Sequence, residues 1–126
     1  MSTKTIHAPG NDAHFMHVKS VPHRVRVRKG DRLLAESTNA LRIMETGHGP
    51  YDPMIYIPEG DVSGPLEAVD GKSTHCPLKG DASYYTLDGD EIAWTYDRPL
   101  EVSQILKGHI AFYPNKVTVE EIGADA

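Results

Sequence analysis

The segment Arg24-Val25-Arg26-Val27-Arg28 alternates strictly between charged and apolar side chains. Because neighbouring side chains of a β-strand point to opposite faces, this period of two places the valines on one face and the arginines on the other. Lys29-Gly30-Asp31 then supplies a turn, and residues 32–36 return as the second arm of a hairpin. We expect a further strand over residues 40–45 to complete a meander. The alternation therefore predicts antiparallel sheet.

Turn signals divide the rest of the chain in the same way. Glycines and prolines crowd residues 46–58 and indicate a long loop that feeds one short strand. Asp88-Gly89 is a strong hairpin signal between two aromatic-rich strands. Short helices are expected over residues 61–69 and 99–107. The sequence predicts a mainly β domain of curled antiparallel sheets, a sandwich or partly open barrel, with one or two short helices.

Composition limits the class of protein. A chain of 126 residues, 39% of them hydrophobic, suits a single β-rich domain, which we assign to residues 15–120. An extended N-terminal segment (1–14) precedes it and a flexible tail (121–126) follows. With 13 basic and 18 acidic residues the net charge is −5, which argues against nucleic acid as a partner. One Cys and no apolar run in residues 1–20 lead us to expect a cytoplasmic protein with no membrane contact.

The stretch from Ser73 to Tyr96 holds the only Cys and the only Trp. Pro77 and Gly80 bracket a tight loop, so the thiol of Cys76 and the ammonium of Lys79 are expected together at the mouth of a strand. A nearby ammonium lowers the pKa of a thiol, and both residues are candidate catalytic groups. The alternative is that Cys76 is a small buried apolar residue. A functional Lys79 should be at least half buried and bound to a side chain from outside residues 73–85.

Glu45 is the third catalytic candidate. On a strand over residues 40–45 it shares a face with Leu41 and Ile43, so its carboxylate would lie on an apolar side with a raised pKa and could act as a general base. The alternative is a carboxylate at the strand end that reaches water. Arg42, on the opposite face, is a candidate ligand-binding residue.

Aromatic side chains could line a ligand cavity. The full set of ligand-binding candidates is Tyr84, Trp94, Tyr96, Arg42 and Tyr56. Strand parity gives Trp94 and Tyr96 a common face and turns Tyr84 away from Tyr85. The alternative is that these aromatics are ordinary core residues or cross-strand pairs.

We predict no metal ligands and identify no cofactor. The closest histidines, His14 and His17, would oppose each other on a strand, and no Cys-x-x-Cys pair exists. His75 and Cys76 are adjacent, so they face opposite ways and His75 is a poor base for the thiol. The arginines of residues 24–28 could bind an anion, or could pair with Glu36 and Glu45 on a solvated face.

Three segments carry a resemblance: Thr74–Tyr85, Ala93–Tyr96 and Gly108–Tyr113. They match the patterns Thr-x-Cys-Pro-x-Lys-Gly-x-Ala-x-Tyr, Ala-Trp-x-Tyr and Gly-x-x-Ala-Phe-Tyr, which resemble the domain-of-unknown-function 427 family. The resemblance extends upstream through Arg24–Glu45 and Tyr56–Pro58 to an opening like Lys4–Gly10, so it covers nearly the whole chain. It implies a mainly β fold without an established activity. The loop Gly47–Pro53 departs from it in being rich in Gly and Pro. A nucleotidyltransferase-like label attached to the family has no counterpart here, because the chain has no Gly-rich phosphate loop and no paired-Asp metal motif.

Two functions are consistent with these residues. The first is that a small molecule is bound or transformed in a mouth formed by the Cys76–Gly80 loop and the aromatic strands. The alternative is a non-catalytic interaction or scaffold domain, whose aromatics are core and whose exposed sheet edge at Arg24–Arg28 meets a partner. Whether the protein is an enzyme and whether it forms a homo-oligomer stay open at this stage.

Overall fold

Two antiparallel sheets make up the protein in a computed structural model, which describes residues 3–123. The larger sheet has the order β1-β2-β5-β6-β11-β10-β9-β7, with β8 also paired to β9, and the smaller has the order β12-β3-β4. The strands of the larger sheet are β1 (Thr3–Ala8), β2 (Asn11–Ser20), β5 (Leu41–Thr46), β6 (Met54–Pro58), β7 (Glu67–Ala68), β8 (Thr74–Cys76), β9 (Gly80–Leu87), β10 (Asp90–Pro99) and β11 (His109–Phe112). Those of the smaller sheet are β3 (Arg24–Lys29), β4 (Arg32–Ser37) and β12 (Thr118–Ile122), and two 3-10 helices, η1 (Glu59–Asp61) and η2 (Glu101–Leu106), complete the fold.

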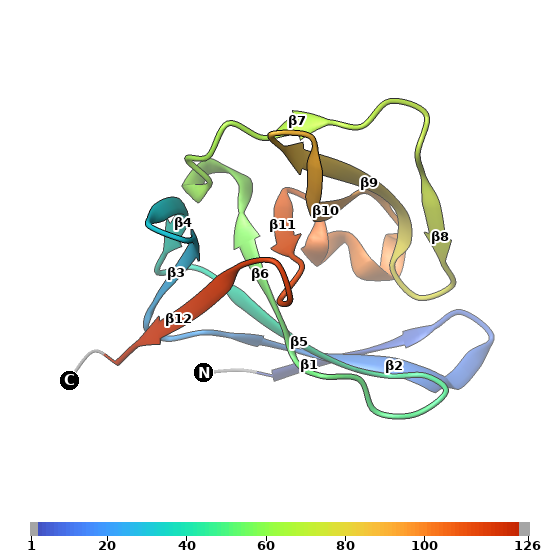
Figure 1. Ribbon diagram of the computed structural model, residues 1–126. Helices are drawn as coiled ribbons and strands as arrows, with labels where there is room; N and C mark the ends of the chain where they lie inside the picture. The colour runs from blue at the N-terminus through green and yellow to red at the C-terminus, as the bar shows by residue number, and fades with distance from the viewer. Residues whose placement is uncertain (1–2, 124–126) are drawn as a thin grey trace.

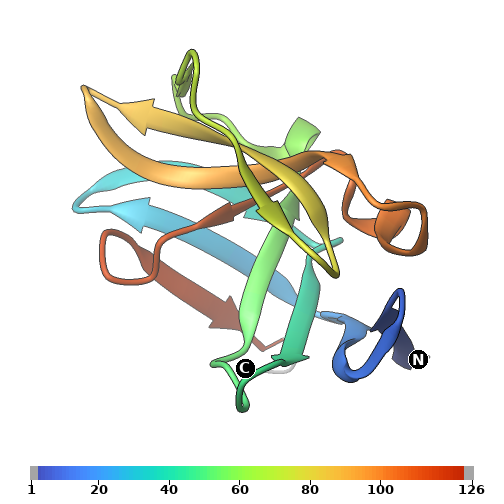
Figure 2. The same cartoon turned by 90° about the vertical axis from the view of Figure 1, so that its right-hand side faces the viewer.

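The larger sheet is strongly curled (Figure 1). Its β1–β2–β5 part and its β8–β9–β10 part lie opposite each other, and η2 lies at the end between them. Figure 2 shows the long β9–β10 hairpin arching over the molecule. The prediction of a mainly β fold of curled antiparallel sheets is therefore confirmed.

Apolar side chains cover both faces of the larger sheet. Along β11, Ile110 and Phe112 pack into one core cluster while Ala111 packs into the other. The first cluster is shared with the smaller sheet, and the second fills the inside of the curl and includes Leu106 of η2. A strand covered on both sides has no solvent face, which is why its sequence reads as a continuous apolar run.

The predicted hairpins form as expected. Asp88 and Gly89 join β9 to β10 with φ values of 52° and 82°, the pair of positive φ angles that a type I′ turn requires. β3 and β4 pair around Gly30, whose φ is 60°. Trp94 and Tyr96 share a face, and Tyr84 and Tyr85 pack into different core clusters, so the parity prediction is also confirmed.

Three predictions about the fold are wrong. The strand over residues 40–45 does not continue the β3–β4 meander, because the chain crosses to the larger sheet and β5 pairs with β2 and β6. Residues 61–69 do not form a helix, since the backbone around Gly64 bonds to Leu34 and residues 67–68 pair with β9. β3 is not an exposed edge, because it lies between β12 and β4.

The ends of the described chain are paired with the domain. β1 forms a hairpin with β2, and Ile6 and Ala8 are buried in the core. Glu121 and Ile122, from the segment predicted as a tail, pair with β3. Residues 1–2 and 124–126 lie outside the described residues, and the division into segment, domain and tail stays a prediction. Within residues 3–123, no helix is both long and apolar enough to cross a membrane.

Gly80 begins β9 and fits where no other residue would. Its φ is 109°, and a Cβ built on it would lie 2.5 Å from the nitrogen of Leu100 and 2.6 Å from the carbonyl oxygen of Arg98. Both contacts are with backbone, so neither can move aside like a flexible side chain. The turn before Gly80 is held by the amide of Leu100, which donates to the carbonyl of Lys79 (3.0 Å), and by the Ser103 hydroxyl, which donates to the carbonyl of Leu78 (2.6 Å).

We therefore expect Gly80→Ala to lower the free energy of unfolding by at least about 2 kcal/mol, through backbone strain and the displacement of η2. Urea denaturation measures the change. Gly49→Ala is the matched control, because a Cβ there meets nothing within 4 Å and the φ is not positive. Equal stability of the two variants would contradict the close-approach argument.

Candidate functional site

A buried ion pair joins the β8–β9 turn to the end of β5. The ammonium of Lys79 contacts the Oε1 atom of Glu45, and the two side chains are only 12% and 14% exposed. Lys79 points inward because its turn is fastened to η2, while Glu45 ends the apolar face of β5 that carries buried Ile43. The prediction that Lys79 is at least half buried, with a partner from outside residues 73–85, is confirmed.

His14 completes the polar cluster. It lies on β2, which pairs with β5, and its Nε2 atom lies 2.8 Å from Oε2 of Glu45. The imidazole is itself only 16% exposed. Both oxygens of the Glu45 carboxylate are thus engaged, one by a histidine from β2 and the other by a lysine from the β8–β9 turn.

Cys76, the last residue of β8, brings a thiol to the same place. Its Sγ atom, a ring nitrogen of His14 and a carboxylate oxygen of Glu45 all lie within 4.8 Å of one another. Cys76 is half-buried and is not part of a disulfide. The structure therefore brings the three predicted catalytic candidates, Cys76, Lys79 and Glu45, together, and adds His14.

The electrostatics of this cluster correct one prediction. Burial opposes ionisation of Glu45, but the charge and hydrogen bond of Lys79, together with the His14 contact, outweigh it and hold the pKa of the carboxyl below its ordinary value. Burial also opposes the ammonium of Lys79, yet the oxygens of Tyr56, Tyr96 and Glu45 raise its pKa above the ordinary value. The predicted raised pKa of Glu45 is wrong, because parity along β5 could not reveal the cation opposite. Both groups are ionised at neutral pH.

Three of the predicted aromatics surround the ion pair. The indole Nε1 of Trp94 donates to the hydroxyl of Tyr56 (3.3 Å), and the Lys79 ammonium lies 5.3 Å from the centre of the Tyr96 ring. Tyr56 and Tyr96 are buried core residues, as the alternative interpretation held. Burial raises the pKa of both phenols, so they remain neutral donors and acceptors beside the pair.

Two candidates lie elsewhere. Arg42 points to the other face of β5 and pairs with Glu121 of β12. The hydroxyl of Tyr84 bonds to Thr74 (2.6 Å), and its ring lies 4.3 Å from the Lys72 ammonium. The arginines of β3 form a paired surface, with Arg24 and Arg26 on Glu36 and Arg28 on Glu120. Glu36 is thus a partner as predicted, whereas Glu45 is not.

Two cavities, which we call the inner and the outer cavity, adjoin at Glu45. The inner one has a volume of about 90 Å³ and is lined by Lys79, Glu45, Tyr51, Tyr56 and Trp94 among others. The outer one has a volume of about 410 Å³ and opens toward solvent. Its polar lining consists of Asn11, His14, Glu45, His48, Tyr51, His75 and Cys76. Glu45 and Tyr51 line both cavities.

The sequence analysis did not assign His14, His48 or Tyr51 to the site. The period of two correctly separates His14 from His17, which bonds to Thr5 on the exposed side of the hairpin. The contact with Glu45 depends on the pairing of β2 with β5, for which the sequence carries no local signal. His75 lines the outer cavity, but its Nδ1 atom bonds to Asp81 (2.7 Å) and not to the thiol.

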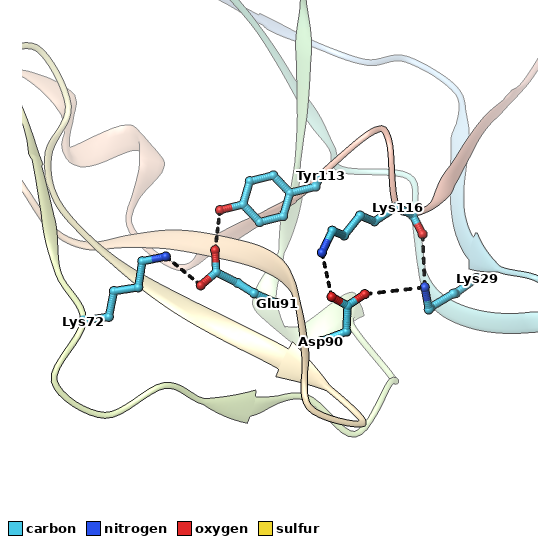
Figure 3. A network of polar contacts seen from close by, with 6 residues as sticks. All are labelled: Lys29, Lys72, Asp90, Glu91, Tyr113 and Lys116. Carbon is cyan, nitrogen blue, oxygen red and sulfur yellow. Dashed lines mark hydrogen bonds and ion pairs between the residues drawn. The ribbon is translucent and has the colours of Figure 1, made fainter.

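A second polar network surrounds the start of β10 (Figure 3). Glu91 accepts from Lys72 (2.8 Å) and from the Tyr113 hydroxyl (2.7 Å), while Asp90 accepts from Lys116 (2.6 Å). These groups satisfy one another and lie near the surface, where ion pairs contribute little stability. We regard this network as structural, because it connects β10 to the β11–β12 loop.

The ion pair should dominate the energetics of this region. We expect Lys79→Met to lower the free energy of unfolding by about 3–5 kcal/mol, because it leaves the buried carboxylate of Glu45 without its cation. Glu45→Gln should also lower the free energy of unfolding, by a somewhat smaller amount. The double variant should lose clearly less than the sum, since it leaves no buried unpaired charge. Urea denaturation of all four proteins gives the coupling, and simple additivity would show that the pair is not formed.

The same pair predicts how the stability of the protein depends on pH. The pKa of Glu45 is lowered on folding, so its stabilising contribution is complete above the ordinary value of 4.5 and disappears as the pH falls through the folded pKa. The difference in unfolding free energy between the wild type and Glu45→Gln should therefore be constant from pH 7 to about 5 and shrink below that. Glu67→Gln, on exposed β7, is the control and should change stability by no more than about 0.5 kcal/mol. A difference that persists at pH 3 would contradict an ionised Glu45.

Comparison with known proteins gives one match. A sequence model described as "Domain of unknown function (DUF427)" covers residues 17–123, which includes the end of β2 and every strand from β3 to β12. No curated protein matches the chain. The match assigns no activity, so a function has to be inferred from the residues of the site.

Proposed function

The chain belongs to the domain-of-unknown-function 427 family, and we propose that it binds a polar small molecule in the outer cavity. The observation that carries the proposal is the carboxylate of Glu45, which lines that cavity and is kept ionised by Lys79, a residue of the adjoining smaller cavity. The volume of the outer cavity, about 410 Å³, lies within the range of known ligand pockets.

Stability alone does not explain the pair. Removing two charges from water costs several kcal/mol for each ion, and apolar residues of similar volume usually stabilise a core as well or better. A buried pair whose carboxylate lines an open cavity instead presents a fixed negative charge that is already desolvated and held in place. Such a charge favours a ligand that carries a hydrogen-bond donor or a positive charge.

The cavity wall also carries hydrogen-bonding groups. It is lined by three imidazoles, those of His14, His48 and His75, and by the hydroxyl of Tyr51. Cys76 adds a thiol, which beside an imidazole and a carboxylate serves in proteins as a nucleophile or as a metal ligand. This combination supports transformation of the bound molecule as well as its binding.

The scaffold interpretation accounts for fewer of these features. It expects core aromatics, as Tyr56 and Tyr96 are, but it also needs an exposed edge at β3, which is the central strand of its sheet. It gives no reason for a thiol, an imidazole and a buried carboxylate to converge on one cavity. We therefore prefer the binding function.

A thermal-shift screen of polar metabolites tests the proposal. A compound that binds the outer cavity should stabilise the wild type by about 2.7 kcal/mol at one hundred times its Kd. His48→Ala removes an exposed lining residue without disturbing the core, so it should weaken this compound's effect. His109→Ala, at the start of β11 and outside the cavity, should leave the effect unchanged.

The screen should be run on metal-free protein and repeated with added ZnCl₂. Two outcomes would count against binding in this cavity: no compound stabilises the wild type under either condition, or both histidine variants respond as the wild type does.

A further inference from the structure

Three side chains that line the outer cavity carry donor atoms suited to a metal ion. We propose that His14, Glu45 and Cys76 bind one divalent transition-metal ion of the zinc type, an inference that rests on the same cavity as the proposed function. One atom from each residue lies within 4.8 Å of the others, and all three side chains are partly buried. This departs from the expectation of no metal, which considered only histidine pairs and Cys-x-x-Cys spacing.

The donor atoms are close to the spacing that a tetrahedral ion needs. Bonds of about 2.0–2.3 Å place neighbouring ligand atoms about 3.3–3.7 Å apart in a tetrahedral site. The nitrogen of His14 and the oxygen of Glu45 are 2.8 Å apart, a hydrogen-bond distance. An ion would take the place of the imidazole proton between these two atoms, and the neutral imidazole would carry its proton on Nδ1 instead. The thiol would need to move by only about 1 Å, which a side-chain rotation supplies.

Lys79 holds the ligand set in place. Its ammonium bonds the Glu45 oxygen that does not face His14, and therefore orients the carboxylate as an outer partner of the site. The positive charge of Lys79 opposes a cation, so a neutral or carboxylate-only site would be weak here. The thiolate that Cys76 becomes on binding compensates: in the occupied site carboxylate, thiolate and ammonium sum to one negative charge, without counting the divalent ion. Binding therefore releases the thiol proton to solvent.

The chemistry of the donors selects the metal. A thiolate and an imidazole favour zinc and its neighbours among the transition metals, whereas magnesium and calcium prefer oxygen ligands alone. Structural zinc sites are closed by four protein ligands, while sites that act on a substrate use three and keep one position open. Three ligands beside a cavity of about 410 Å³ correspond to the open kind. The ligand class thus narrows to polar molecules with a metal-binding group, such as a carboxylate or a hydroxyl.

Titration of the metal-free full chain with CoCl₂ tests the inference directly. We expect one ion per chain and the near-ultraviolet absorption of a cobalt–thiolate bond. Competition with ZnCl₂ should remove that absorption. Cys76→Ser should abolish the band, and His14→Gln should weaken the affinity at least about 100-fold, because each removes one of three ligands. His17→Gln is the matched control, since it lies on the same strand but on the other face, and should bind as the wild type does.

A second measurement needs no variant. Zinc should slow the reaction of the Cys76 thiol with a thiol reagent in the wild type, and its binding should release a proton that a weakly buffered solution detects. Circular dichroism and thermal unfolding establish that each variant is folded. The inference is overturned if no cobalt–thiolate absorption develops, if Cys76→Ser binds as tightly as the wild type, or if zinc leaves the thiol equally reactive.

Failure of this inference differs from failure of the proposed function. A metabolite that stabilises the metal-free wild type, together with no metal binding, would leave the binding function standing and remove the metal. One bound cobalt ion with a thiolate band, but no stabilising metabolite, would establish the metal and remove the small-molecule proposal.

Discussion

The contact between Lys79 and Glu45 is the constraint on which the rest of the site depends. In the sheet order, β5 and β9 are separated by β6, β11 and β10, so only the curl of the sheet brings these two charges together. Burying them is favourable only if both are ionised, paired and hydrogen-bonded, because either one alone would face a large desolvation cost. The pair therefore links the shape of the sheet to the chemistry of the cavity, and a change in curvature would disturb both.

The backbone that delivers Lys79 is equally constrained. Gly80 approaches the chain at residues 98–100 so closely that no side chain fits, and η2 fastens the preceding turn through the carbonyls of Leu78 and Lys79. Leu78 is fully buried between these attachments. The lysine is thus presented by a rigid turn, and rigidity of this kind is what a binding site needs to hold charges ready for a ligand.

Local sequence patterns predicted the features that depend on neighbours along the chain. The Asp88-Gly89 turn and the parity of Trp94 and Tyr96 follow from residue type and a period of two, whereas an inward Lys79 was expected only on the premise that the residue is functional. Features that depend on pairing between distant strands were not predictable in this way. Nothing in the sequence near residue 40 indicates that the chain leaves one sheet for the other, so the predicted meander was wrong. The position of β3 between β4 and β12 could not be predicted either, because it depends on pairing with the C-terminal strand.

Glu45 shows how this limit carries over into chemistry. Its place on an apolar face suggested a raised pKa, but the sign of the shift is set by two partners, Lys79 from 34 positions later and His14 from 31 positions earlier. With those partners, the carboxylate is a fixed anion and a poor general base. A fixed anion that lies beside an imidazole and a thiol is better suited to holding a cation or orienting a ligand. The same long-range pairing that reverses the pKa also changes the role that the residue can have.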